Sequence, residues 1–248
     1  MDKSISQDQF YNDLWLNQWA DMEKYNPTAR HLKRFIAQLI YPLSDVNSLL
    51  DVGCGMGFNI EDLRKNFPQL KLTGADITEP IIELAKQYTG VDSLTTYKTI
   101  DLGSENLDAS EQYDLVLCNQ VLEHIENDFL AIQNLTKLTN KYILITVPSG
   151  RYNSTSKLVG HHRHYSKADL VDKLTSAHLS IIYIREWGFP FHSLYKTALG
   201  SLSPESQTAA GMGKYGMIKK GISNILYTLF SFNIFNRGEN IIVLAAKI

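Results

Sequence analysis

The chain has 248 residues, 44% of them apolar and 20% charged, which is enough for a sizeable core and excludes a disordered or collagen-like chain. Twenty-four Lys and Arg residues against 26 Asp and Glu residues give a formal net charge of -2, without the basic excess of a protein that binds nucleic acid mainly through its phosphates. Because the sequence has neither a signal-peptide pattern nor an 18-residue apolar run, it favours a cytoplasmic location.

Residues 1–45 are predicted to form helices. Aromatic side chains recur every fourth residue from Tyr11 to Trp19, which is typical of one helical face. A second helix is predicted to begin at Asn26, because an asparagine cap followed by proline is a strong helix start, and to end before Pro42.

Residues 46–187 alternate short apolar runs with helical patterns, and helices are predicted to start after Thr78 and Ser166. Runs that are apolar on both faces predict βαβ units and a parallel sheet covered by helices on each side. The predicted strands are residues 46–52, 70–75, 93–100, 113–119, 142–147 and 179–184. No repeat or linker divides the chain, so a single domain over residues 1–248 is expected.

Residues 188–238 are predicted to be a helical cap insertion before a last strand at 239–248, because the stretch is too long for a structureless loop. Apolar residues from Ile218 to Phe230 share one helical face, and residues 214–237 contain four basic side chains and no acid. Three interpretations stay open: a cap helix packed on the domain, a lid over the acceptor, and a peripheral contact with an anionic membrane surface.

The motif LLDVGCGMGF places Gly53, Gly55 and Gly57 directly after the first predicted strand and before a helical pattern. Such a loop lets a ligand approach the backbone closely at the carboxyl end of a strand. The dinucleotide fingerprint needs its third glycine at position 58, where the sequence has Phe58. This difference argues against a nicotinamide cofactor.

Three carboxylates follow the first three strands. Asp51 precedes the glycines, where a positively charged or hydroxyl-rich ligand can use it. Asp76 ends the second strand, where a carboxylate accepts hydrogen bonds from both hydroxyls of a ribose; its alternative role is a charge at the start of the next helix. Asp101 follows the third strand and suits an adenine amino group, the alternative being a solvated loop carboxylate.

These motifs resemble those of the class I S-adenosylmethionine-dependent methyltransferases, in the branch that methylates small molecules. The resemblance also rests on CNQVLEHIEN, residues 118–127, and covers residues 46–187 plus the last strand. It implies an α/β fold with a doubly wound, mostly parallel seven-stranded sheet and an antiparallel last strand. It further implies S-adenosylmethionine as cofactor, S-adenosylhomocysteine as product, and a cofactor site made of Asp51, Gly53, Cys54, Gly55, Gly57, Phe58, Asp76, Ile77, Asp101, Leu102, Asn119 and Gln120.

The resemblance also suggests catalytic residues. His124 in VLEHI falls at the rim where donor and acceptor meet, and it is the first candidate for the general base that a hydroxyl acceptor needs. The alternative is that Glu123 and His124 only hold the start of the next helix. Ubiquinone-type enzymes that bind a metal here have a further Glu at the position of Gln120, so no metal is expected.

The motif GHHRHYS is the densest polar cluster of the chain. His164 is a second catalytic candidate, and Arg163 and Tyr165 are candidates for binding the acceptor. Tyr11 and Trp19 join them, because the N-terminal helices of this fold lie across the cofactor mouth. The alternatives are a structural clamp for the histidine motif and core packing for the two aromatic residues.

The sequence therefore predicts an enzyme that methylates a hydroxyl or amine of a small molecule, such as a sugar, lipid, quinone or secondary metabolite. Two other functions stay open: a non-catalytic protein that binds S-adenosylmethionine and, with less support, a nicotinamide-dependent oxidoreductase. The sequence does not determine the acceptor or the oligomeric state.

Overall fold

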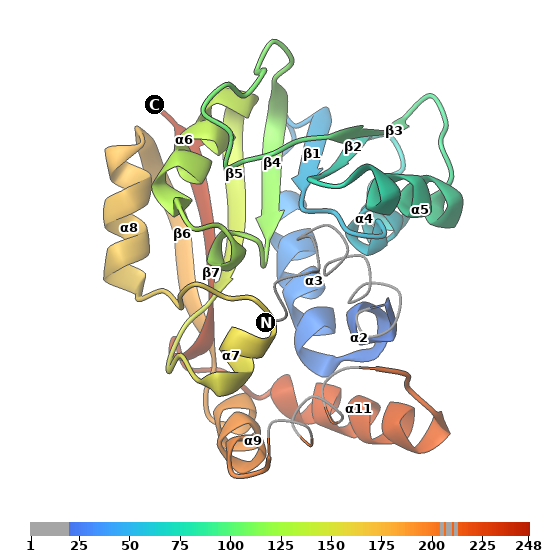
Figure 1. Cartoon of the computed structure of the whole chain (residues 1–248), viewed down its shortest axis with the longest axis vertical. Coiled ribbons are helices and arrows are strands. Elements are labelled where there is room, and N and C mark those ends of the chain that lie inside the picture. Colours follow the sequence, from blue (N-terminus) through green and yellow to red (C-terminus); the bar gives the residue numbers. More distant parts are fainter. Residues whose placement is uncertain (1–19, 204–205, 207–209, 211–212) are drawn as a thin grey trace, which may run out of the picture.

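The structure is a computed structural model that describes residues 20–203, 206, 210 and 213–248. Seven strands form one sheet in the order β3-β2-β1-β4-β5-β7-β6 (Figure 1). The strands are β1 (Ser48–Val52), β2 (Lys71–Asp76), β3 (Thr95–Thr99), β4 (Tyr113–Asn119), β5 (Thr139–Pro148), β6 (Leu179–Gly188) and β7 (Gly238–Lys247). Neighbours from β3 to β5 pair in parallel, whereas β7 is antiparallel to both β5 and β6. The predicted seven-stranded sheet with an antiparallel last strand is confirmed.

Helices lie on both faces of the sheet. They are α2 (Ala20–Tyr25), α3 (Pro27–Ile40), α4 (Phe58–Asn66), α5 (Glu79–Thr89), the 3-10 helix η2 (Leu122–His124), α6 (Asp128–Leu138), α7 (Ser154–Leu158), α8 (Lys167–Ser176), α9 (Phe191–Gly200) and α11 (Met217–Phe230). Asn26 caps α3 by accepting a hydrogen bond from the N–H of Thr28 at 2.8 Å. Ser166 caps α8 in the same way, from the N–H of Asp169 at 3.1 Å. The helix α5 begins directly after Thr78, so all three helix starts predicted from the sequence are confirmed.

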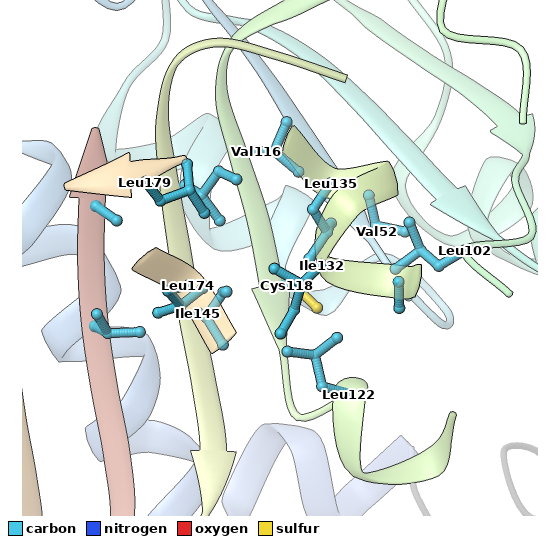
Figure 2. Close-up of a cluster of buried hydrophobic side chains, with 14 of the residues drawn as sticks. Val52, Leu102, Val116, Cys118, Leu122, Ile132, Leu135, Ile145, Leu174 and Leu179 are labelled. Atoms are coloured by element: carbon cyan, nitrogen blue, oxygen red, sulfur yellow. The ribbon is translucent and has the colours of Figure 1, made fainter. Parts of the chain in front are cut away.

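The sheet separates two hydrophobic clusters, because successive side chains of a strand point to opposite faces. Leu50 of β1 belongs to the cluster under α6 and α8, whereas Leu49 belongs to the cluster under α3 and α4. Figure 2 shows members of the first cluster: Val52, Leu102, Val116, Cys118, Leu122, Ile132, Leu135, Ile145, Leu174 and Leu179. Burial on both faces fixes the register of the parallel strands and aligns their carboxyl ends.

The carboxyl ends of β1, β4 and β5 point toward the end of the molecule at which α9 and α11 lie (Figure 1). In open α/β sheets, ligands bind outside these strand ends. In the part of the chain that the structure describes, no helix has the length and apolar character needed to cross a bilayer. The predicted division of the chain into four segments within one domain stays a prediction.

Candidate active site

The glycine loop between β1 and α4 is tied to the end of β2. The N–H groups of Gly53 and Cys54 donate to the carbonyl oxygen of Ala75 at 2.7 and 2.9 Å, and the N–H of Gly55 donates to Oδ2 of Asp76 at 2.9 Å. The φ angles of Gly53 and Gly57 are 73° and 82°, in the left-handed region that glycine adopts without strain. The loop therefore turns tightly over the ends of two strands.

Asp76 is held in place by backbone donors. Besides the bond from Gly55, its Oδ1 accepts from the N–H of Ile77 at 2.8 Å. Burial raises the pKa of Asp76, and hydrogen bonds from the backbone of Gly55, Ile77 and Thr78 counteract that rise. A carboxylate oxygen accepts more than one hydrogen bond, so both oxygens keep capacity for the hydroxyls of a ribose.

Asp51 is fully buried at the end of β1, where the side chain of Asn59 approaches its carboxyl group. Burial raises the pKa of Asp51 to about 8; the Asn59 side chain lowers it, while the charges of Asp76 and Glu23 raise it further. A buried carboxylate is unfavourable unless it is protonated or paired. The site therefore fits a ligand that brings a positive charge, as S-adenosylmethionine does through its ammonium and sulfonium groups.

The sequence did not identify two residues that act on Asp51, namely Glu23 and Asn59. Glu23 lies in α2, and its charge raises the pKa of Asp51. Asn59 is the second residue of α4, directly after the glycine loop. Nothing in the sequence marks Glu23, because it stands in a short polar helix, whereas the position of Asn59 beside the loop was a usable signal.

Five further predicted cofactor residues differ in the exposure of their side chains. Ile77 is 44% exposed, and Asp101 is exposed with Oδ1 accepting from the N–H of Gly103 at 2.7 Å. Both follow neighbouring strands, since β2 pairs with β3, and so they share one sheet edge. By contrast, the side chains of Cys54, Phe58 and Leu102 are buried. Their side chains pack in the protein, and only their backbone is left for a ligand.

Asn119 and Gln120 end β4 beside β5. The Asn119 Oδ1 accepts from the hydroxyl of Thr146, and the backbone N–H of Gln120 donates to the Thr146 carbonyl at 2.9 Å. Gln120 has a φ of 57°, which turns the chain sharply at the strand end. A side chain added at Gly53 would lie 2.3 Å from the side chain of Val121, so the β4 loop lies directly against the glycine loop.

This contact brings a histidine cluster beside the glycine loop. The rings of His124 and His161 are perpendicular with centroids 4.8 Å apart, and His161 Nδ1 lies 3.2 Å from His164 Nε2. Glu123, His124 and His161 each offer a ligand atom, and these atoms all lie within 4.8 Å of one another. His161 and Glu123 were not among the predicted catalytic residues. The structure joins them to His124 and His164.

The cluster is uncharged near neutral pH. Burial raises the pKa of Glu123 to about 8, and both of its buried carboxyl oxygens lack a hydrogen-bond partner. Burial lowers the pKa of His124 to about 4 and that of His161 to about 3. A carboxylic acid next to neutral imidazoles is an arrangement that can accept a proton from a bound hydroxyl. Two histidines with one carboxylate are also a zinc donor set, so the expected absence of a metal stays a prediction.

Arg163 and Tyr165 clamp the β4 loop. Arg163 donates to the carbonyl oxygen of Ile125 at 2.6 Å. The Tyr165 hydroxyl lies 3.2 Å from the Leu122 carbonyl and 2.9 Å from Oδ2 of Asp128. Tyr165 is 2% exposed. These contacts match the structural clamp, which was the alternative to acceptor binding for both residues. The other two predicted acceptor residues, Tyr11 and Trp19, lie outside the described residues.

Replacing Asp128 by alanine is expected to lower the free energy of unfolding by about 2–3 kcal/mol. Asp128 is 7% exposed, and Lys173 Nζ lies 2.6 Å from its Oδ2 in addition to the Tyr165 hydroxyl. Because the Lys173 side chain is partly exposed, the loss of unfolding free energy is expected to be smaller than for a fully buried ion pair. Chemical denaturation measures the change, and Asp169→Ala is the control, because Asp169 makes an exposed ion pair with the same lysine and is expected to cost less than about 1 kcal/mol. Equal losses in both variants would contradict the clamp.

The fold and the glycine-loop segment of this chain are similar to those of known methyltransferases. A family model described as a methyltransferase domain matches residues 50–141. The chain is 29% identical over 166 residues to a malonyl-[acyl-carrier protein] O-methyltransferase from Bacillus cytotoxicus, covering 66% of this chain and 54% of that one. It is 25% identical over 173 residues to a ubiquinone biosynthesis O-methyltransferase from Hydrogenovibrio crunogenus, covering 68% and 69%.

Among solved structures, the N-methyltransferase NodS from Bradyrhizobium japonicum, in complex with S-adenosylhomocysteine, matches with a TM-score of 0.63 at 16% identity and covers 97% of both chains. At this identity the likeness shows the fold alone. The chain spans about half the length of the first curated relative that it matches. Residues 50–141 thus match a methyltransferase domain, and the chain has the fold of a methyltransferase structure that contains S-adenosylhomocysteine.

Proposed function

We propose that this protein transfers a methyl group from S-adenosylmethionine to a hydroxyl group of a small molecule. The observation that supports the proposal is the contact between the glycine loop and Val121, because Val121 lies in the same short loop as His124. Two curated relatives are named O-methyltransferases, which supports oxygen over nitrogen as the acceptor atom.

S-adenosylmethionine supplies, when bound, a methyl group on a positively charged sulfur. The backbone of the glycine loop would hold the cofactor, Asp76 would bind its ribose hydroxyls, and Asp51 would pair with its positive charge. The chain's main task is then orientation, since holding two reactants in line is worth about 7–11 kcal/mol.

A hydroxyl acceptor loses its proton as its oxygen forms the bond to the methyl carbon and the carbon–sulfur bond breaks. His124 is neutral near pH 7, because burial lowers its pKa to about 4, and a ring nitrogen can take this proton and release it to solvent. A general base of this kind contributes roughly 10²- to 10⁴-fold. His161 and His164 would line the acceptor side of the same rim.

A screen for S-adenosylhomocysteine tests the proposal. Purified protein is incubated with labelled S-adenosylmethionine and panels of sugars, lipids, quinones and amines, and products are identified by mass spectrometry. Turnover with a hydroxyl acceptor, unchanged after treatment with a chelator, is expected. Binding of S-adenosylhomocysteine without turnover on any panel would favour a non-catalytic binding protein, and loss of turnover with the chelator would place a metal in the histidine cluster.

A further inference from the structure

The helix α11 packs on the protein through the side that carries Ser223, Tyr227 and Phe230. Arg30 Nη1 donates to Oδ1 of Asn224 at 2.9 Å, and His31 Nε2 donates to the backbone carbonyl of Tyr227 at 2.8 Å. The Arg30 guanidinium also lies 3.9 Å from the centre of the Tyr227 ring. Phe230 is the one large apolar residue of the helix that is fully buried. The α3 helix thus fixes which side of α11 faces the protein.

The opposite side of α11 is an exposed apolar face. Ile218 is 83% exposed and Ile225 is 70% exposed. The exposed apolar side chains of α11 and the segment after it are Met217, Ile218, Ile222, Ile225, Leu229, Phe232, Ile234 and Phe235. The helix does pack on the domain as a cap, and Phe230 of the predicted apolar face is buried there, but Ile218, Ile222 and Ile225 of that face are exposed. Contiguous apolar surface of this kind marks an interaction site.

The charges around this face favour one partner. Residues 214–237 carry four basic side chains and no acid. Lys214 and Arg237 are exposed at the two ends of the segment. Lys219 and Lys220 lie half-buried, with Nζ 4.0 Å and 4.1 Å from the ring centres of Tyr215 and Tyr25. Asp21 of α2 acts on Lys219, so the exposed Lys214 and Arg237 carry the charge argument. In a symmetric dimer through this face, these two basic residues would meet the same residues of the second copy. An anionic lipid surface complements both the charge and the apolar character.

We propose that the apolar face of α11 and of the segment up to Phe235 lies on the surface of an anionic membrane. The 14 residues of α11 span about 21 Å, less than the roughly 30 Å of a bilayer core, so the helix lies in the interface plane. Because β4 and β5 point toward this end of the molecule (Figure 1), the mouth of the site would lie close to the bilayer. A further consequence, that the acceptor is carried by the membrane, rests on the proposed methyl transfer.

Co-sedimentation of the full chain with vesicles tests the proposal. One set of vesicles contains phosphatidylcholine alone and the other adds phosphatidylglycerol. At low salt we expect pelleting with the anionic vesicles only, and high salt weakens it. Ile218→Asp with Ile225→Asp is expected to lower the partition coefficient about 100-fold. Lys214→Gln with Arg237→Gln is expected to lower it about 30-fold at low salt, since each basic group near such a surface contributes about fivefold.

Val91→Asp is the matched control, because Val91 is 58% exposed in the loop between α5 and β3, away from α11. It is expected to leave partitioning within about twofold. Equal pelleting with both kinds of vesicle, or none with the anionic vesicles, overturns the proposal. So does a dimer in sedimentation velocity that Ile225→Asp dissociates, because a second copy then covers the face. S-adenosylhomocysteine affinity is measured for every variant. Loss of vesicle binding with unchanged affinity concerns the membrane proposal alone, whereas absence of S-adenosylhomocysteine binding in the unaltered protein would contradict the proposed methyl transfer.

Discussion

Replacing Asp76 by alanine is expected to weaken binding of S-adenosylhomocysteine about 10²- to 10⁴-fold. Hydrogen bonds to a charged group contribute about 1.5–3 kcal/mol each, and the two ribose hydroxyls would make two of them, with 1.4 kcal/mol for each factor of ten. Asp76 is also the acceptor for the N–H groups of Gly55 and Ile77. Its loss therefore loosens the glycine loop as well as removing a ligand contact.

Calorimetric titration with S-adenosylhomocysteine measures the effect, and thermal unfolding of the same samples shows whether the fold is intact. Asp101→Ala is the comparison, because Asp101 is exposed and holds only a local N–H in the structure. Its affinity loss is expected to stay near tenfold. An unchanged affinity in folded Asp76→Ala would remove Asp76 from the cofactor site.

The strands of the sheet could be predicted from apolar runs in the sequence. The predicted bounds differ from the observed ones where a strand ends in polar residues. The strand predicted at 113–119 is β4 with the same bounds, because it is buried on both faces. The strand predicted at 142–147 starts earlier, at Thr139, which pairs with Tyr113. In the same way, β6 continues past residue 184 because β7 pairs with its polar residues. Backbone pairing, which carries no hydrophobic signal, sets these ends.

Site residues could be predicted from the sequence where a carboxylate stands at the end of a predicted strand. Asp51 and Asp76 were found in this way, and the structure places both beside the glycine loop. The approach of His161 to His124 was not predictable, because it depends on how the loop after β5 folds back over the loop after β4. The periodicity of α11 likewise identified an apolar face but not its direction, which polar contacts from Arg30 and His31 decide.

Replacing His124 by alanine is expected to lower kcat about 10²- to 10⁴-fold while leaving S-adenosylhomocysteine affinity within about threefold. The reason is that a general base acts in the transition state, whereas the cofactor contacts are made by other residues. His162→Ala is the matched control, because His162 is the exposed histidine of the same motif and is expected to keep full activity. Full activity in folded His124→Ala would leave His124 with the structural role of holding the loop.

The pH profile separates these two roles further. An ordinary histidine would make the rate rise around pH 6.5, but burial lowers the pKa of His124 to about 4. The rate with a hydroxyl acceptor should therefore be flat from pH 6 to 7, where Glu123 also keeps its proton, and fall below about pH 5. Burial of His31, His124 and His161 favours unfolding as the pH falls below 6.5, because the unfolded chain protonates them first. Asp51 and Glu123, whose pKa values burial raises to about 8, act in the opposite direction. Circular dichroism at each pH distinguishes unfolding from protonation of the base, and a rate that rises around pH 6.5 in the folded protein would contradict a buried His124 as the base.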